Sequence, residues 1–312
     1  MKIPGFGLTL IQLCLNLSIY SYTRKYNNPD LEVLYEGIFH STLFHPFYYV
    51  SKLNNNLFIT IRGSNDEGDM GSLQYRNLVP TKYGYFTEAI YRSSYYIYLE
   101  TYETIKNFDG DVYITGHSFG GSISSALLTI FKAEFPDRNF YAISFASTPS
   151  IPKNQTNLYK DLIATIVNEY DIIPLLAPHT LFNTISSTIP GFLSLPFSLA
   201  YNRFQEILGL YTMSKNPADP FILDIVNQSF QYYYPLMVDY KQTGLLNYCL
   251  PGTIYLIGEK KNSIDECLVE DQFETFKEIS LNPKAITFHT PVPYLNSLKL
   301  IGQDQENNNN DL

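Results

Sequence analysis

A serine in a glycine-rich turn is the residue of this 312-residue sequence best suited to chemistry. Ser118 lies in "GHSFG", within the stretch "DVYITGHSFGGSISSALL". A β-type run precedes the serine and a helix-type run follows it, which is the context that a G-x-S-x-G nucleophile requires. Gly116 and Gly120 suit a sharp turn, and the start of the helix offers N–H groups to an oxyanion. We therefore interpret Ser118 as a nucleophile, with a serine N-cap in a glycine-rich turn as the structural alternative.

A nucleophilic serine needs a histidine base, and only two histidines follow Ser118. In hydrolases with such a turn the chain order is serine, acid and then histidine, so His179 and His289 are the candidates. His289 follows the strand-like "AITF" and is expected at the carboxyl end of a strand, where active sites of open parallel sheets collect. His179 lies in an irregular region. We favour His289, and a hydrogen-bonded structural histidine is the alternative for either residue.

The carboxylate that orients the base should lie between the serine and the histidine in the chain. Asp171 ends the strand-like "LIATIVNEYD" and precedes "IIP". Asp137 and Asp161 precede strands instead of ending them, so they are not favoured. We expect Asp171 to be the acid, and the alternative is an Asx turn before Pro174.

An oxyanion hole requires a second donor from an earlier strand-to-helix loop. The stretch "LFITIRGSNDEGDM" supplies such a loop, and Ser64 could offer both its backbone N–H and its hydroxyl. Phe119, directly after the nucleophile, would give the other backbone N–H. From the residues alone, a simple turn role for Ser64 is as well supported as a role in the oxyanion hole.

The elements around these residues alternate between strand-like and helix-like runs, which predicts an α/β fold. We expect a mainly parallel central sheet with helices on both faces. Residues 1–302 are expected to form a single domain, with an apolar insertion at about 175–250 before the last strands and a disordered tail at 303–312. The insertion could serve either to pack against the core or to contact lipid, and the sequence favours neither role. The strand-like runs are "FYYVSKLNNNLFITIRGS" (two strands and an Asn-rich turn), "DVYIT", "FYAISFAS", "LIATIVNEYD", "GTIYLIG" and "AITF", and the helix-like runs include "YFTEAIYRSSYYIYLETYETIKNF" and "GGSISSALLTIFKAEF".

The apolar N-terminal stretch "LTLIQLCLNLSIY" carries a polar stripe at helical spacing, formed by Thr9, Gln12 and Asn16. This pattern favours an amphipathic helix packed on the domain, with a secretory signal peptide as the alternative. The expected location is accordingly cytoplasmic, with peripheral membrane contact as an option, and secretion if the stretch is a signal. The three cysteines are too far apart for a disulfide framework, so buried thiols are expected, with a Cys249–Cys267 bridge as the alternative.

The charge balance narrows the classes of partner. The net charge of −9 argues against a nucleic-acid partner, because phosphates demand clustered Lys and Arg. No polybasic run is present to hold an anionic membrane surface. The serine chemistry draws its proton transfer from histidine, so no cofactor and no metal are expected.

Four motifs together resemble a known family. The segments "FITIRGS", "ITGHSFGG", "IVNEYDIIP" and "FHTPVPYLNSL" are similar to those of the class 3 lipases of the α/β-hydrolase fold. These are the fungal-type triacylglycerol lipases and their diacylglycerol-lipase relatives, and the resemblance covers most of residues 8–300. It implies the catalytic residues Ser118, Asp171 and His289 and the oxyanion residues Ser64 and Phe119, with Tyr294 where the family often has an aromatic residue.

The resemblance implies a serine hydrolase that cleaves the carboxylic ester bonds of acylglycerol lipids through an acyl-enzyme. The expected partner is a lipid ester substrate, with peripheral contact to a lipid surface, and the oligomeric state is not predicted. The alternatives are a phospholipase or another esterase or thioesterase on the same triad, or a catalytically inactive lipid-binding relative. In the family an Asp-Trp pair usually follows the oxyanion loop, whereas here Asp69 is followed by Met70 and Gly71, which predicts a short or differently built lid. The long gap from Asp171 to His289 leaves head group and chain length open.

Overall fold

The computed structural model of the chain describes residues 6–26, 28–73, 75, 77–171, 173–175, 195–203, 227, 230–231, 248–258, 265–267 and 287–310. For residues 153, 175, 265–267, 287 and 303–310 it describes the backbone alone. Most of the insertion expected at about 175–250, and the alternative base His179, lie outside the described residues.

An eight-stranded sheet forms the centre of the molecule, in the order β1-β2-β3-β6-β7-β9-β11-β12. The five strands from β3 to β11 pair in parallel, while β1–β2, β2–β3 and β11–β12 pair antiparallel. The expected mainly parallel sheet is therefore confirmed, with antiparallel strands added at both edges. The strands are β1 (Glu32–Glu36), β2 (Tyr48–Leu53), β3 (Asn56–Ile61), β6 (Asp111–His117), β7 (Phe140–Phe145), β9 (Ile163–Asn168), β11 (Thr253–Ile257) and β12 (Asp265–Cys267).

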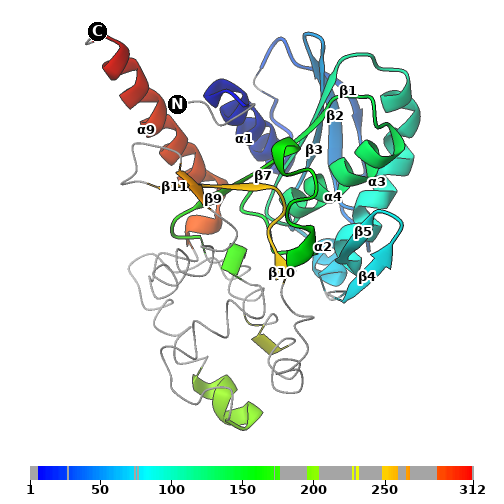
Figure 1. Ribbon diagram of the computed structural model, residues 1–312, viewed down its shortest axis with the longest axis vertical. Helices are drawn as coiled ribbons and strands as arrows, with labels where there is room; N and C mark the ends of the chain where they lie inside the picture. The colour runs from blue at the N-terminus through cyan, green and yellow to red at the C-terminus, as the bar shows by residue number, and fades with distance from the viewer. Residues whose placement is uncertain are drawn as a thin grey trace.

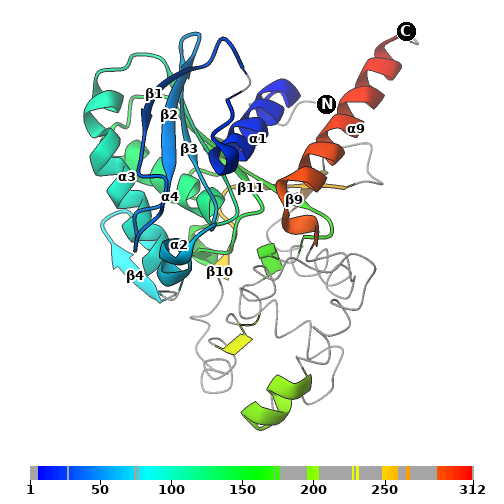
Figure 2. The same ribbon diagram turned by 180° about the vertical axis from the view of Figure 1, so that it is seen from behind.

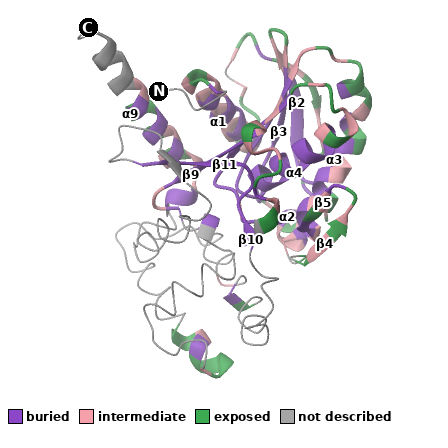
Figure 3. Cartoon of the chain, in the orientation of Figure 1, coloured by how far each residue is buried: buried purple, intermediate pink, exposed green. Residues whose placement is uncertain are grey.

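The central strands bury both of their faces, and their side chains alternate between two hydrophobic cores. In β3, Leu57, Ile59 and Ile61 join the core on one face of the sheet, while Phe58 joins the core on the other face. The strands read as continuous apolar runs because a parallel sheet is covered on both sides. Figure 3 shows these strands as a band of buried residues through the middle of the molecule.

In the described part of the chain, two helices cover each face of the sheet. Helices α3 (Glu88–Lys106) and α4 (Phe119–Glu134) pack on one face, and α1 (Leu8–Thr23) and α9 (Pro291–Asn310) on the other (Figures 1 and 2). Every residue of α4 from Phe119 to Phe131 is buried. The nucleophile turn thus leads into a helix that is buried over its first thirteen residues.

Helix α1 packs on the domain as its polar stripe predicts. Ile11, Leu15 and Leu17 are buried, whereas Thr9 is exposed and the Gln12 amide donates a 3.1 Å hydrogen bond to the Leu298 carbonyl of α9. Cys14 and Cys249 are buried thiols, and the Cys267 side chain lies outside the described residues. No helix in the described part of the chain has the length and apolar character needed to cross a bilayer.

Two expectations differ from the structure near the end of the chain. Residues 287 and 288, the last two of the predicted strand "AITF", belong to the 3-10 turn η6 (Thr287–His289), so the strand assignment is wrong there. A short apolar run does not by itself distinguish a strand from other buried segments. Helix α9 continues through Asn310, where the composition predicts a tail from residue 303, and the side chains beyond Gly302 are not described.

Residues 197–203 are also helical, and several smaller elements lie elsewhere in the described chain. Helix α2 (Glu67–Ser72) follows β3, and β4 (Leu78–Thr81) and β5 (Gly84–Thr87) form a hairpin before α3. Strands β8 (Ile151–Pro152) and β10 (Tyr248–Cys249) pair with each other. The remaining 3-10 turns are η1 (Lys153–Gln155), η2 (Lys160–Leu162) and η3 (Ile173–Leu175).

Candidate active site

Ser118 stands on a strained turn between β6 and α4. Its backbone has φ 58° and ψ −126°, a conformation that costs a non-glycine residue about 1–3 kcal/mol. The Ser118 N–H donates a 2.8 Å hydrogen bond to the Phe145 carbonyl at the end of the neighbouring strand β7. The sheet therefore holds the serine in a conformation that the isolated chain would avoid.

Two glycines make room for this turn. A β-carbon added to Gly116 would lie 2.5 Å from the carbonyl carbon of Gly120, and one added to Gly120 would overlap the Ile61 carbonyl oxygen. The start of α4 can approach β3 and β6 this closely only because neither position carries a side chain. The G-x-S-x-G spacing is thus a steric requirement of the local structure.

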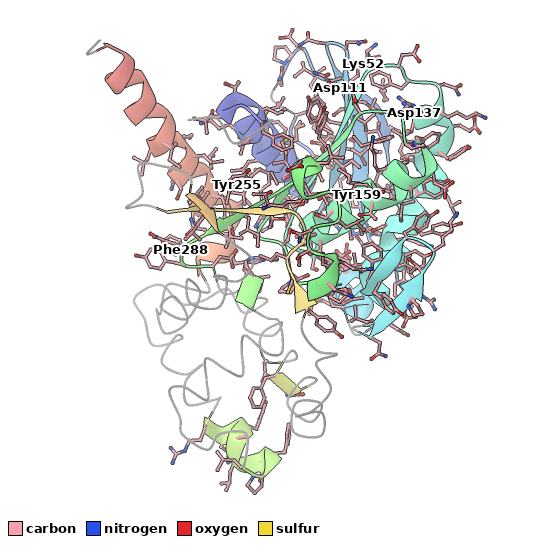
Figure 4. All side chains as sticks on the ribbon, viewed as in Figure 1. Lys52, Asp111, Asp137, Tyr159, Tyr255 and Phe288 are labelled. Atoms are coloured by element: carbon pink, nitrogen blue, oxygen red, sulfur yellow. The ribbon has the colours of Figure 1, made fainter. Side chains whose placement is uncertain are left out.

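His289 lies directly against the serine. Its Nε2 atom is 2.8 Å from the Ser118 Oγ, and its side chain is buried. His289 lies on the turn η6, directly after Phe288. Asp111 marks the amino end of β6, and Figure 4 labels Phe288 on the opposite side of the ribbon from Asp111. His289 therefore lies at the carboxyl edge of the sheet, as expected, although a turn and not a strand end carries it.

Asp171 lies on the other side of the imidazole. The His289 Nδ1 atom is 3.0 Å from Asp171 Oδ2 and 3.1 Å from Oδ1. If this nitrogen carries the proton, Nε2 presents a lone pair to the Ser118 hydroxyl, which is the tautomer that a general base requires. Ser118, His289 and Asp171 thus form one hydrogen-bonded row that can move a proton from the serine to the imidazole.

The position of Asp171 differs in detail from the sequence expectation. Strand β9 ends at Asn168, and Asp171 lies in the turn that follows. Its Oδ1 accepts a 2.9 Å hydrogen bond from the Ile173 N–H two residues later, so the Asx turn considered as an alternative is also present. One carboxylate fixes the local turn and contacts the histidine as well.

Tyr294 is a member of the site that sequence reasoning identified only as an aromatic residue. Its hydroxyl donates a 2.6 Å hydrogen bond to Asp171 Oδ2, and the side chain is fully buried in the first turns of α9. Burial and the nearby Asp171 charge raise the Tyr294 pKa well above its usual value, so it remains a donor. The hydroxyl itself was the available signal, because a buried tyrosine usually finds a hydrogen-bond partner.

The loop after β3 carries Ser64 past the nucleophile. Strand β3 pairs in parallel with β6, with Ile61 opposite Gly116, so the two strands deliver this loop and the nucleophile turn to the same edge. A β-carbon on Gly63 would lie 3.1 Å from the Ser118 Cβ. The Ser64 side chain is buried, and its Oγ has no hydrogen-bond partner among the described residues. An unpartnered buried hydroxyl beside a nucleophile is suited to receive an oxyanion.

Phe119 is placed to supply the second donor. It is the first residue of α4, and the first N–H groups of a helix have no acceptor within the helix. Its side chain is buried in the core on the α3–α4 face. Only its backbone is therefore a candidate for a role at the site.

A buried arginine anchors the loop that carries Ser64. The Arg62 Nη2 atom is 2.8 Å from Asp66 Oδ2 and 3.5 Å from Asp69 Oδ2, and Asp69 accepts a 2.9 Å hydrogen bond from the Asn65 N–H. Chiefly through burial, the pKa of Asp69 is raised to about 6. Asp69 is thus a structural anchor of the loop. It lies in helix α2, where the departure from the family's Asp-Trp pair predicts a short or differently built lid.

His117, next to the nucleophile, has its own partner at the base. Its Nε2 atom lies 2.7 Å from the backbone oxygen of His289. Its pKa is lowered well below the usual value, first by burial and then by the neighbouring His289. The sequence contained no signal for this contact, since it joins residues 172 positions apart.

No group of three or more histidine, cysteine, aspartate or glutamate side chains in the described ranges is arranged to hold a metal ion. The arrangement of Ser118, His289 and Asp171 can activate a hydroxyl for attack on a carbonyl carbon, with Ser64 and Phe119 beside the oxygen that becomes charged. This is the chemistry of acyl transfer.

Comparison with known proteins agrees with this reading. Residues 58–181 match the family model described as lipase (class 3), a segment that includes Ser64, Ser118 and Asp171. A triacylglycerol lipase from Penicillium expansum is similar in structure with a TM-score of 0.54 at 13% identity, over 88% of each chain. The Rhizomucor miehei lipase propeptide complex is similar with a TM-score of 0.57 at 14% identity, over 93% of this chain and 80% of that chain. No curated protein matches the sequence. At these identities the likeness establishes the α/β-hydrolase fold.

Proposed function

We propose that this chain, whose residues 58–181 match the class 3 lipase family model, is a serine hydrolase that cleaves carboxylic ester bonds of acylglycerol lipids through an acyl-enzyme. The observation that carries this proposal is the row of hydrogen bonds from Ser118 Oγ through His289 to Asp171. All three side chains are buried at the same edge of the sheet. Such a row gives a serine the base that its hydroxyl lacks on its own.

In the first half of the reaction His289 takes the proton of Ser118 while the serine oxygen attacks the ester carbonyl. Asp171 holds the ring and stabilises the imidazolium that forms. The negative carbonyl oxygen of the tetrahedral intermediate is held by the Phe119 N–H and by Ser64. His289 then gives its proton to the departing alcohol oxygen, and the acyl group stays on Ser118.

In the second half water replaces the alcohol. His289 removes a proton from the water as it attacks the acyl carbon, and a second tetrahedral intermediate uses the same oxyanion donors. Its collapse releases the fatty acid and returns the proton to Ser118. No step in this cycle draws on a metal or a cofactor.

We propose that apolar side chains beside the oxyanion loop contact the lipid surface. Leu43 and Tyr75 are exposed, at 44% and 40%, and the Phe44 ring packs edge-on against the Tyr75 ring at 4.9 Å. The loop that carries Leu43 lies against α2, because a β-carbon on Gly71 would meet the Leu43 side chain at 3.5 Å. This cluster would place an apolar face near the site where the acyl chain must enter.

The decisive experiment replaces the nucleophile. Ser118→Ala should reduce turnover of a p-nitrophenyl ester to a small residual rate and abolish covalent labelling by a fluorophosphonate probe. A folded Ser118→Ala protein with near wild-type turnover would remove Ser118 from the mechanism. Absence of labelling in a folded wild-type sample would instead favour an inactive lipid-binding relative.

The substrate class is tested separately. We expect faster turnover of emulsified long-chain acylglycerols than of soluble short-chain esters, phospholipids or thioesters. Leu43→Ser should lower turnover at the emulsion surface while leaving hydrolysis of a soluble short-chain ester unchanged. Equal rates on short and long chains would contradict the lipid preference and leave the serine hydrolase assignment standing.

A further inference from the structure

A second row of hydrogen bonds approaches the site from helix α1, on the backbone side of the base. The Tyr22 hydroxyl lies 3.0 Å from His117 Nδ1, and His117 Nε2 lies 2.7 Å from the backbone oxygen of His289. From this row we infer that Tyr22 and His117 are positioning residues that hold the base His289 against the nucleophile. The inference rests on the proposed function, since it concerns how His289 is held at the right distance from Ser118.

The chemistry of the partners fixes the direction of each hydrogen bond. A carbonyl oxygen can only accept, so His117 Nε2 must carry a proton and donate it to His289. His117 stays neutral because burial and the neighbouring His289 lower its pKa, and a neutral imidazole with a proton on Nε2 has a bare Nδ1. Nδ1 therefore accepts from Tyr22, whose pKa is raised chiefly by burial, so that it keeps its proton.

The base needs such an anchor because no strand holds it. His289 belongs to the 3-10 turn η6, outside the strands of the central sheet. Asp171 fixes the imidazole through Nδ1, but it contacts only the side chain. His117, in contrast, donates a hydrogen bond to the backbone of His289. His117 is the last residue of β6 and directly precedes Ser118. The strand that presents the nucleophile thus also sets the distance to the base, and displacement of about 1 Å in such a site costs about a hundredfold in rate.

Tyr22 also touches the loop on the opposite side of the nucleophile. A β-carbon on Gly63 would collide with the Tyr22 hydroxyl and lie 2.6 Å from the His117 carbonyl oxygen. The hydroxyl thus fills the space beside the backbone that leads into Ser64. Through one side chain, the last turn of α1 contacts the oxyanion loop and, by way of His117, the loop of the base.

The test removes the Tyr22 hydroxyl alone. In Tyr22→Phe we expect kcat per active site to fall about fivefold to tenfold with KM unchanged, because one partly buried hydrogen bond is lost and Tyr22 acts only through the position of the base. Titration of active sites with a fluorophosphonate probe corrects for any misfolded fraction. A residue with only a structural role would lower the number of titrated sites and leave kcat per site unchanged.

Rescue by a donor tests the second residue. His117→Gln can still present an N–H to the His289 carbonyl, whereas His117→Leu has a similar size and no donor. We expect the Gln variant to retain several-fold more kcat per site than the Leu variant. If the Leu variant fails to fold, the Tyr22→Phe result decides the question by itself.

Tyr49→Phe is the matched control. The Tyr49 hydroxyl is buried and donates a 2.8 Å hydrogen bond to the Leu17 carbonyl of the same helix α1, in the core on the α1–α9 face. Its loss should leave kcat per site at the wild-type value. Wild-type kcat in Tyr22→Phe, or an equal loss in Tyr49→Phe, would overturn the positioning role. Full turnover in Ser118→Ala would refute the proposed function instead, so the two failures are distinguishable.

Discussion

The Nε2 atom of His289 lies 2.8 Å from the Oγ of Ser118, although 171 positions separate the two residues in the chain. The contact joins the turn after β6 to the turn before α9, on the same edge of one sheet. Each side of the contact has its own support: the Phe145 carbonyl holds the serine backbone, and Asp171 holds the imidazole.

Replacing Asp171 with asparagine should lower kcat by about 10³- to 10⁴-fold, because the amide no longer favours the tautomer with the proton on His289 Nδ1. The size of the side chain is preserved, so the fold should survive. Steady-state hydrolysis of a soluble ester provides the measurement. Asp161→Asn, at an exposed position of η2, is the control and should match the wild type. A small effect in Asp171→Asn would show that the base is oriented by another group.

Replacing Ser64 with alanine should lower kcat by about 10²- to 10³-fold with little change in KM, as expected for a donor used only when the oxyanion forms. Ser51→Ala offers a matched comparison, because Ser51 is also buried with an Oγ that has no hydrogen-bond partner among the described residues, but it lies on β2. Equal kinetics in the two variants would exclude the Ser64 hydroxyl from the oxyanion hole.

Replacing Gly120 with alanine should destabilise the protein by about 3 kcal/mol, because the added methyl group overlaps the Ile61 carbonyl and forces the start of α4 away from β3. The midpoint of urea unfolding measures this change. Gly7→Ala adds a methyl group where no heavy atom lies within 4 Å, so its midpoint should stay at the wild-type value. Comparable midpoints in the two variants would mean that the turn can relax around a side chain.

Burial of neutral His117 predicts a loss of stability in acid. The unfolded chain binds a proton at His117 below about pH 6.5, while the folded protein, whose pKa there is lowered, does not bind one until the pH is much lower. Stability from this residue is therefore present above about pH 6.5 and declines as the pH falls, by up to about 1.4 kcal/mol per pH unit, until the pH passes the folded pKa.

Urea unfolding of wild type and His117→Gln between about pH 7.5 and about pH 4.5 isolates this contribution, because the other groups titrate alike in both proteins. The free energy of unfolding of the wild type relative to the variant should decrease as the pH falls. A difference that stays constant across this range would show that His117 titrates normally in the folded protein.

Local patterns were enough to predict much of the fold. The hairpin of β2 and β3, the strands β6, β7, β9 and β11, and the helices α1, α3 and α4 all follow from apolar periodicity and from turn residues. Strand β1 and the pairing of β12 at the far edge were not anticipated, because alternating strands and helices indicate a parallel sheet and say little about its borders.

The site residues divide in the same way. Ser118 was predictable because strand, glycine turn and helix are adjacent in the sequence, and Asp171 and His289 because the chain order leaves few choices. The roles of Tyr294 and His117 were not, since they depend on contacts between residues more than a hundred positions apart. "AITF" misled for a different reason: a 3-10 turn before α9 and a short buried strand present the same apolar run.

Because Ile61 pairs with Gly116, the length of β3 sets the position of Ser64 relative to Ser118. Deleting one residue inside β3 would draw Ser64 back by about 3.3 Å relative to Ser118 and turn its side chain to the other face of the sheet. The two-residue turn between Leu53 and Asn56 lies at the opposite end of that strand and sets no such alignment. We therefore expect single-residue changes in length to be tolerated at Asn54 and Asn55 and to abolish activity anywhere between Asn56 and Gly63.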